Sequence, residues 1–254
     1  MGMLDQKVAL ITGGGKGIGK GIALAMAREG ARLVIGCNSS RGMAEDTLRE
    51  LEAITPAILV QSDVGTPEGC QALVDAAKRQ YGRLDILVNN AAIQTQYSML
   101  EGQYEDFRRI IRVNLRAAYL MMQKSLPLLK AAGHGRIILI SSVHGKRPND
   151  FDAAYSVSKG GLKMLCREAA IEFAPYGITV NLIAPGGVKI EGKTGAPRTP
   201  LYRTVTRPRR LSQYPLGRIG LPSDSGELAC YIASDKSDHL SGASIRLDGC
   251  AMLL

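Results

Sequence analysis

The chain lacks the residues from which disulfide frameworks and metal sites are usually built. It has no tryptophan, three histidines and five cysteines in 254 residues. The cysteines are odd in number, scattered, and without C-x-x-C spacing, and no two histidines are paired at ligand spacing. We therefore expect buried or idle thiols, and neither a disulfide framework nor a metal site. The cysteines are Cys37, Cys70, Cys166, Cys230 and Cys250.

Long hydrophobic runs are also missing. Apolar stretches such as 137–140 are far too short to cross a bilayer, and no signal-peptide pattern precedes the first expected strand. The net charge of +9 would suit a nucleic-acid partner, but the basic residues are spread along the chain except at 198–210, without interleaved aromatics. We expect a soluble, cytoplasmic protein with no membrane or nucleic-acid partner. A phosphate-rich cofactor or an anionic substrate would account for part of the charge.

Strand and helix patterns alternate to the end of the chain. With 45% hydrophobic residues and no linker, residues 1–254 are expected to form one domain. The alternation predicts an α/β, Rossmann-type, doubly wound fold with a mostly parallel seven-stranded sheet and helices on both faces. The expected strands are Val8–Thr12, Arg32–Cys37, Ala57–Gln61, Leu84–Asn89, Gly135–Ser141, Thr179–Ile183 and Ala243–Leu247. The expected helices are Lys16–Glu29, Arg41–Ile54, Pro67–Tyr81, Tyr104–Ala131, Asp152–Tyr176 and Ser223–Ala233.

A glycine-rich turn separates the first strand from the first helix. Its sequence runs Thr-Gly-Gly-Gly-Lys-Gly-Ile-Gly over residues 12–19, a spacing that differs from the commoner G-x-G-x-x-G. Glycines let the backbone approach a pyrophosphate closely, and the start of the helix offers unpaired N–H groups. The strand–turn–helix context therefore predicts a dinucleotide site. The expected contacts are Gly13, Gly15, Lys16, Gly17, Ile18 and Gly19.

A tyrosine and a lysine further along the chain indicate proton chemistry. Tyr155 and Lys159 are four residues apart, so in a helix they project from one face. A tyrosine ordinarily titrates near pH ~10, and a lysine ammonium within reach lowers its pKa by favouring the phenolate. The pair therefore predicts a residue that exchanges protons with a substrate. Taken singly, the pair could equally be a surface contact.

The end of the second expected strand predicts which dinucleotide is used. Sites for NAD place an acidic residue there, and the segment 35–41 contains none. Lys16 and Arg41 can pair with a 2′-phosphate, and Asn38, Ser39 or Ser40 can add hydrogen bonds. We expect NADP(H), with NAD(H) also possible. The alternative is that Lys16 is simply solvated and Arg41 has no part in binding.

Taken together, the motifs resemble the short-chain dehydrogenase/reductase family over nearly the whole chain. The matching segments are the glycine turn, 63–64, 89–92, Asn114, 141–142, the Tyr155/Lys159 pair and 181–186. The resemblance implies that Tyr155 is the general acid/base and that Ser142 holds the substrate carbonyl or hydroxyl. It implies that Lys159 binds the nicotinamide ribose while lowering the tyrosine pKa, and that Asn114 holds a water in the proton path.

The resemblance also implies further cofactor contacts. Asp63 and Val64 would lie at the adenine, Asn90 and Ala91 would support the ribose, and the backbone from Pro185 through Gly186 to Val188 would meet the nicotinamide amide. Ala92 departs from the family, which usually has glycine there, and its methyl group should perturb the packing only slightly. Asp63 could otherwise be only a helix cap, and Ser142 only a turn residue.

The substrate is less well defined. The runs 141–145 and 215–220 are similar to those of bacterial glucose 1-dehydrogenases, which predicts a sugar, polyol or sugar-acid substrate. The expected substrate lid at about 186–214 is rich in lysine and arginine, which favours an anionic substrate, although a solvated loop explains it equally well. We expect His144 to contact the substrate. Asp150, Asp152 and Glu191 could also approach it.

Alternative functions remain open at this stage. A 3-oxoacyl (carrier protein) reductase or a steroid dehydrogenase would share every motif, and an NADPH-sensing regulator or a structural binding partner would share the fold. Members of the family pair through two long helices, here expected at Tyr104–Ala131 and Asp152–Tyr176. A homodimer or homotetramer acting on a small-molecule alcohol or carbonyl is therefore expected.

Overall fold

The computed structural model describes residues 2–95, 99–148, 153–190 and 214–253. Its strands form one seven-stranded sheet in the order β3-β2-β1-β4-β5-β6-β7, and every neighbouring pair is parallel. The strands are β1 (Val8–Thr12), β2 (Arg32–Cys37), β3 (Ala57–Gln61), β4 (Ile86–Asn89), β5 (Arg136–Ile140), β6 (Thr179–Pro185) and β7 (Ser244–Leu247). The predicted α/β fold is confirmed.

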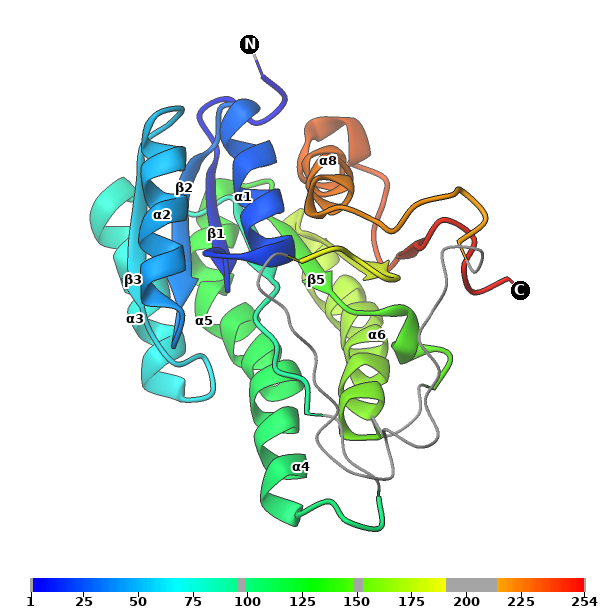
Figure 1. The fold of residues 1–254 in the computed structure, drawn as a ribbon. Helices are drawn as coiled ribbons and strands as arrows, with labels where there is room; N and C mark the ends of the chain where they lie inside the picture. Colours follow the sequence, from blue (N-terminus) through cyan, green and yellow to red (C-terminus); the bar gives the residue numbers. More distant parts are fainter. Residues whose placement is uncertain (1, 96–98, 149–152, 191–213, 254) are drawn as a thin grey trace.

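Helices cover both faces of the sheet (Figure 1). The α-helices are α1 (Gly17–Arg28), α2 (Arg41–Glu52), α3 (Pro67–Tyr81), α4 (Tyr104–Ile111), α5 (Ala117–Ala132), α6 (Ala153–Phe173) and α8 (Pro222–Ala233). Successive strand residues point to opposite faces of the sheet, so each strand contributes side chains to two hydrophobic cores, one on each face. Leu10 packs into the core beneath α3, α5 and α6, and Ile11 packs into the core beneath α1 and α8.

Several predicted boundaries were wrong by a few residues. Strand β4 begins at Ile86 instead of Leu84, and β6 continues to Pro185 because it pairs with β7 along its last four residues. The single helix expected over Tyr104–Ala131 is divided into α4 and α5 by a π-helical segment, Arg112–Arg116. Most of the predicted lid lies outside the described residues, as do Asp150, Asp152 and Glu191. In the described part of the chain, no helix is long and apolar enough to cross a membrane.

Helices α1 and α8 lie unusually close, and two glycines permit this approach. A Cβ atom built on Gly226 would lie 2.6 Å from the carbonyl oxygen of Gly21 and 2.8 Å from the Ala25 Cβ. A Cβ atom on Gly21 would lie 2.4 Å from the Pro222 backbone. All three distances are shorter than real Cβ atoms show. Helix α1, which follows the glycine turn, is therefore packed directly against α8, which is distant in sequence.

We predict that Gly226→Ala lowers the free energy of unfolding by roughly 1–3 kcal/mol, because the added methyl group overpacks the α1–α8 contact. Urea unfolding monitored by circular dichroism measures the change. Gly42→Ala is the matched control, since nothing lies within 4 Å of a Cβ at Gly42 in helix α2. Equal stabilities of the two variants would show that the close contact is not needed.

Candidate active site

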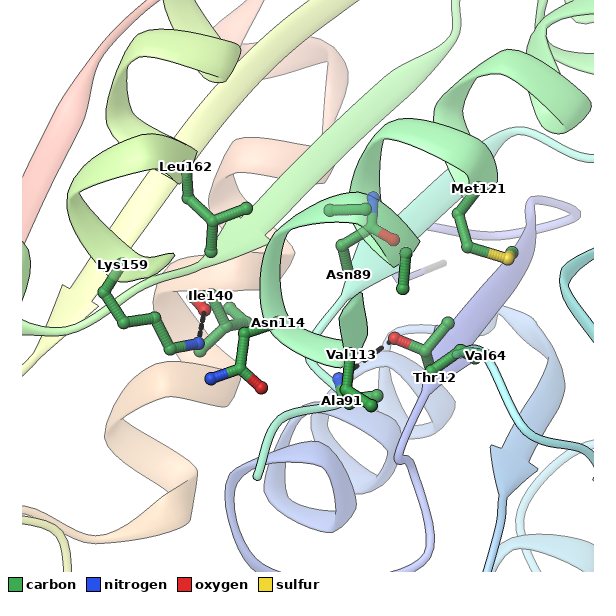
Figure 2. A pocket seen from close by; sticks show the side chains of 12 residues that line it. Thr12, Val64, Asn89, Ala91, Val113, Asn114, Met121, Ile140, Lys159 and Leu162 are labelled. Carbon is green, nitrogen blue, oxygen red and sulfur yellow. Dashed lines mark hydrogen bonds between the residues drawn. The ribbon is translucent and has the colours of Figure 1, made fainter. Parts of the chain in front are cut away.

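Polar side chains gather at the carboxyl ends of the central strands. Thr12 ends β1, Asn89 ends β4, and Ser141 and Ser142 follow β5. Ligands of doubly wound sheets bind at this edge. A small cavity of about 10 Å³ lies here, with Thr12, Asn89, Asn114 and Lys159 in its lining (Figure 2). Its volume is close to that of a single water molecule.

Lys159 is the charged residue among the described residues that line this cavity. It projects from α6, is 2% exposed, and its Nζ donates a hydrogen bond of 2.8 Å to the carbonyl oxygen of Ile140 at the end of β5. Burial lowers the pKa of Lys159 from its ordinary 10.5 to about 7, because an ammonium is poorly solvated inside the protein. Lys159 is therefore charged in only part of the neutral pH range in the cofactor-free protein.

Tyr155 lies on the same helix, one turn before Lys159. The Lys159 Nζ atom is 5.5 Å from the centre of the Tyr155 ring, and the Tyr155 side chain is half-buried. The four-residue spacing thus brings the two side chains together as predicted from helical geometry. The contact places the lysine amine over the face of the tyrosine ring.

Asn114 lies in the π-helical segment and joins three parts of the site. Its Oδ1 accepts a 2.8 Å hydrogen bond from the Ile93 N–H, and its Nδ2 donates to the Ile93 carbonyl at 2.9 Å and to Ser158 Oγ at 3.1 Å. Ser158 Oγ in turn donates to the Tyr155 carbonyl at 2.7 Å. Insertion of a π turn commonly redirects a side chain at a functional site. Here the Asn114 side chain ties the segment after β4 to α6.

Ser142 and its neighbours form the turn after β5. Ser142 Oγ accepts a 3.2 Å hydrogen bond from the His144 N–H, so the serine caps the short 3-10 turn Val143–Gly145. Ser141 Oγ donates to the Lys159 carbonyl at 2.8 Å and fixes this turn against α6. His144 Nδ1 lies 3.2 Å from the Arg147 carbonyl oxygen. The imidazole that was predicted to contact substrate therefore also has a partner in its own turn.

The glycine turn has the features of an anion site. Gly13 and Gly17 have φ values of 65° and 55°, which favour glycine. Helix α1 begins at Gly17 with neither a side-chain cap nor an acidic residue in its first turn, so its first N–H groups and dipole are available to an anion. Gly15 and Gly19 have a different role: a Cβ on them would meet Ala44 Cβ at 2.4 Å and the Gly13 carbonyl oxygen at 2.1 Å. The turn therefore fits a pyrophosphate.

The cations predicted to bind a 2′-phosphate are both exposed and both have partners. Lys16 Nζ donates to Ser40 Oγ at 2.6 Å. Arg41 forms an ion pair of 2.8 Å with Glu45 and donates to Gln61 Oε1 at 3.2 Å. Glu45 raises the Arg41 pKa through this hydrogen bond and its charge. An anion at this edge would thus compete with Glu45 for Arg41.

The exposed Asn38 and Ser39 complete the predicted 2′-phosphate segment. The backbone carbonyl of Asn38 accepts a 3.1 Å hydrogen bond from Gln61 Nε2. Asn38 and Ser39 lie between β2 and α2, beside the partners of Arg41. The four residues predicted from segment 35–41 are therefore neighbours in space as well as in sequence.

The remaining predicted cofactor residues surround the same strand edge. Asp63 Oδ1 accepts from the Gly65 N–H at 2.8 Å, so it stabilises its own turn, and Val64 is buried. Pro185 ends β6, the Gly186 N–H donates to the Leu247 carbonyl at 2.9 Å, and Val188 forms a β-bridge with Gly220. Ile18 is half-buried on the first turn of α1.

Thr12 was not recognised from the sequence, although it links two strand ends. Its Oγ1 accepts hydrogen bonds of 3.0 Å from the N–H groups of Asn90 and Ala91, and the Asn90 Nδ2 donates to the Thr12 carbonyl at 2.9 Å. Ser158 and Glu45 were missed too. The sequence signal for Ser158 is its spacing of three residues from Tyr155, which places both on one face of the expected helix. The signal for Glu45 is its i,i+4 spacing to Arg41, which favours an ion pair.

Comparison with known proteins identifies the family. The sequence profile described as short chain dehydrogenase matches residues 7–199. The chain belongs to the short-chain dehydrogenase family. A putative short-chain alcohol dehydrogenase from Sinorhizobium meliloti 1021 has the same fold, with a TM-score of 0.89, 30% identity and 98% of both chains covered.

Characterised relatives of this short-chain dehydrogenase have several named activities. Glucose 1-dehydrogenase 2 of Bacillus subtilis (strain 168) is 33% identical over 97% of this chain and 95% of its own. Trans-4-hydroxycyclohexanecarboxylate dehydrogenase of Sinomonas cyclohexanicum is 36% identical, covering 96% and 92%. A 3-oxoacyl-[acyl-carrier-protein] reductase FabG of Staphylococcus aureus (strain Mu50) is 33% identical, covering 97% and 98%. Enzymes of this family are oxidoreductases that act on CH–OH groups with NAD(P)(H).

The pKa of Lys159 predicts how the stability of the cofactor-free protein depends on pH. Because the folded-state pKa is about 7 and the ordinary value is 10.5, the unfolded chain binds more protons between these pH values. The free energy of unfolding of the wild type should therefore rise, relative to Lys159→Met, as the pH increases from about 7 to 10.5. Urea unfolding at several pH values tests this. The exposed Lys78→Met is the control, and a constant difference between wild type and Lys159→Met would contradict the burial effect.

Proposed function

We propose that the protein is an NADP(H)-dependent oxidoreductase that interconverts a secondary alcohol and a carbonyl on a sugar, polyol or sugar acid. The observation that carries this proposal is the pairing of Tyr155 with the buried Lys159 near Ser142, which follows β5. Residues 1–254 would act as one catalytic domain, with 186–214 as the substrate lid.

The chain's own residues would handle the proton. The bound nicotinamide supplies or accepts the hydride. Tyr155 would exchange a proton with the substrate oxygen, and Ser142 Oγ would donate a hydrogen bond to that oxygen, which stabilises its developing charge in the transition state. Lys159 would hold the nicotinamide ribose and favour the phenolate. Asn114 would position the segment after β4 at the water-sized cavity.

A water in that cavity would serve the proton path. Asn89 Nδ2, which belongs to a residue lining the cavity, is buried and has no hydrogen-bond partner among the described residues. The Lys159 amine and the Asn114 side chain, which both line the cavity, are drawn next to each other in Figure 2. A water there would satisfy the Asn89 donor and lie beside the lysine amine. The side-chain atoms of Asn114 already bond Ile93 and Ser158, so Asn114 would shape this water site while Asn89 supplies the free donor.

The preference for NADP(H) is supported by the charges around α2. Lys16 and Arg41 supply two cations next to Asn38, Ser39 and Ser40, and none of these five residues is acidic. Glu45 is the nearest acid, but it is already paired with Arg41. NAD(H) remains the second cofactor in this proposal. If Arg41 stays paired with Glu45, its charge is neutralised and it gives no preference for a 2′-phosphate.

The substrate proposal is supported by the names of relatives that have similar sequence identity to this chain. One is named for glucose and another for a hydroxycyclohexanecarboxylate, and both names describe hydroxylated ring compounds. The relative named for 3-oxoacyl reduction supports the second candidate, reduction of a 3-oxoacyl group. We propose a cytoplasmic location for either candidate, and a small-molecule substrate for the first.

We also propose a homodimer or homotetramer formed through α4, α5 and α6. Large apolar side chains are exposed on these helices, including Tyr119 on α5 and Val157, Met164 and Ile171 on α6. Val157, Met164 and Ile171 are spaced by seven residues and so share one face of α6. Contact with a second copy would remove this face from water.

We predict that Tyr155→Phe reduces kcat by roughly 10²-fold or more while leaving NADP(H) affinity nearly unchanged, because only the transferable proton is lost. Nicotinamide absorbance is followed with both cofactors against sugars, polyols, sugar acids, steroids and 3-oxoacyl esters. Tyr231→Phe on α8 is the control for loss of a tyrosine hydroxyl. Retained turnover in Tyr155→Phe would refute the acid/base assignment, and turnover only with 3-oxoacyl esters would favour the second candidate.

We predict that Lys16→Ala with Arg41→Ala weakens NADPH binding about tenfold more than NADH binding, because two charge-assisted contacts to the 2′-phosphate are lost. Glu45→Gln should do the reverse and tighten NADPH about twofold, since it releases Arg41 from an exposed ion pair. Fluorescence titration measures both affinities. Asp46→Asn, which breaks the Arg49–Asp46 pair on the same helix, is the control. Equal losses for the two cofactors would exclude a 2′-phosphate site.

A further inference from the structure

A basic groove lies on the α6 side of the sheet, and no role described so far uses it. Its volume is about 960 Å³, near the upper end of the range for small-molecule sites. Ser141, Ser142 and Lys159 form part of its lining, so the groove adjoins the proposed catalytic residues. Helix α6 and the chain end that bounds the groove lie in the same half of the molecule in Figure 1.

Cations predominate among the charged residues that line this groove in the described part of the chain. Five of these lining residues outside the proposed site are basic, and no described lining residue is aspartate or glutamate. Among the described residues, neither Lys146 nor Lys163 forms an ion pair, whereas Arg246 Nε lies 3.4 Å from Asp248 Oδ1. Clustered like charges raise the free energy of the protein unless an anion binds among them. The five are Lys146, Arg147, Lys163, Arg167 and Arg246.

The cations on α6 form a row that leads away from the site. Lys159, Lys163 and Arg167 are spaced by four residues and line one side of the helix. Eight residues of helix rise by about 12 Å, so the row covers a distance comparable to that of an extended small molecule. The facing surface includes the apolar Leu182 and Ala184 of β6. The groove therefore combines an apolar floor with cationic sides.

We propose that this groove binds the carboxylate or phosphate end of the substrate while the reacting carbon lies at Ser142. The inference rests on the proposed function and narrows it to anionic alcohols or carbonyls, such as sugar acids. Lys163 and Arg167 would bind the anion by charge-assisted hydrogen bonds. Lys146 and Arg147, on the turn that follows Ser142, would approach it from the other side.

Direct binding tests the site without requiring turnover. Calorimetry on the wild-type protein compares gluconate with sorbitol, and hexanoate with hexanamide, so that each anion has a neutral counterpart. We expect at least one anion to bind about tenfold more tightly than its counterpart, and Lys163→Gln with Arg167→Gln to abolish the difference. The control variant, Lys78→Gln with Arg79→Gln, removes the same charge from exposed positions on α3. It should retain the difference in affinity between the anion and its neutral counterpart. Equal binding of acid and neutral partner by the wild type would overturn the proposal.

Two further measurements separate the alternatives. The anion that binds should inhibit turnover competitively with the alcohol or carbonyl substrate, and non-competitive inhibition would overturn its assignment to the substrate site. Light scattering of the Lys163→Gln/Arg167→Gln variant should give the wild-type mass. A changed mass would show that the groove is a contact between copies of the chain, which overturns the proposal. Anion binding with no turnover on any substrate would refute the oxidoreductase function and leave the anion site standing.

Discussion

The hydrogen bond from the buried Lys159 amine to the Ile140 carbonyl is the interaction on which the site depends. It joins α6 to the end of β5, and Ser141 Oγ closes a second link by donating to the Lys159 carbonyl. The turn after Ser142 adds a third constraint, since a Cβ at Gly145 would lie 2.7 Å from the Lys159 carbonyl oxygen. Burying an amine is unfavourable unless it is hydrogen-bonded, so these contacts hold Lys159 where the sheet and α6 meet. Tyr155 is positioned by the same helix.

A second set of hydrogen bonds connects this centre to the glycine turn. Thr12 fixes Asn90 and Ala91 against the end of β1, and Asn114 fixes Ile93 against α6 through Ser158. The segment after β4 is thus held at both ends, on one side by the strand that starts the dinucleotide turn and on the other by the helix that carries the tyrosine. The regions proposed to bind the cofactor and to handle the proton are therefore parts of one hydrogen-bonded structure.

The sequence predicted the fold, and the grouping of the candidate site residues at one edge of the sheet, because both depend on local patterns. Apolar runs predicted β1, β2 and β3 to the residue, and the carboxyl ends of parallel strands must share one edge. What it could not predict depends on contacts between distant segments. The π turn that redirects Asn114, the extension of β6 alongside β7 and the approach of α8 to Gly21 all arise from packing. The partners of Arg41 were missed because sequence shows charge but not pairing.

The basic residues of this chain differ in whether a carboxylate of the protein compensates their charge. Arg41, Arg83 and Arg218 each have a carboxylate partner, so their charges are largely compensated within the protein. The groove beside α6 differs, because its lining residues in the described part of the chain include several cations and no aspartate or glutamate, and Arg246 among them is paired with a carboxylate, that of Asp248. A net charge of +9 alone could not distinguish a cofactor site from a substrate site or a general affinity for polyanions. Within the described residues, Lys146 and Lys163 of this groove form no ion pair, whereas at the edge around Arg41 the cation is already paired with Glu45. The two basic regions therefore differ in how far carboxylates of the protein compensate them, and this difference is the basis for proposing an anionic substrate.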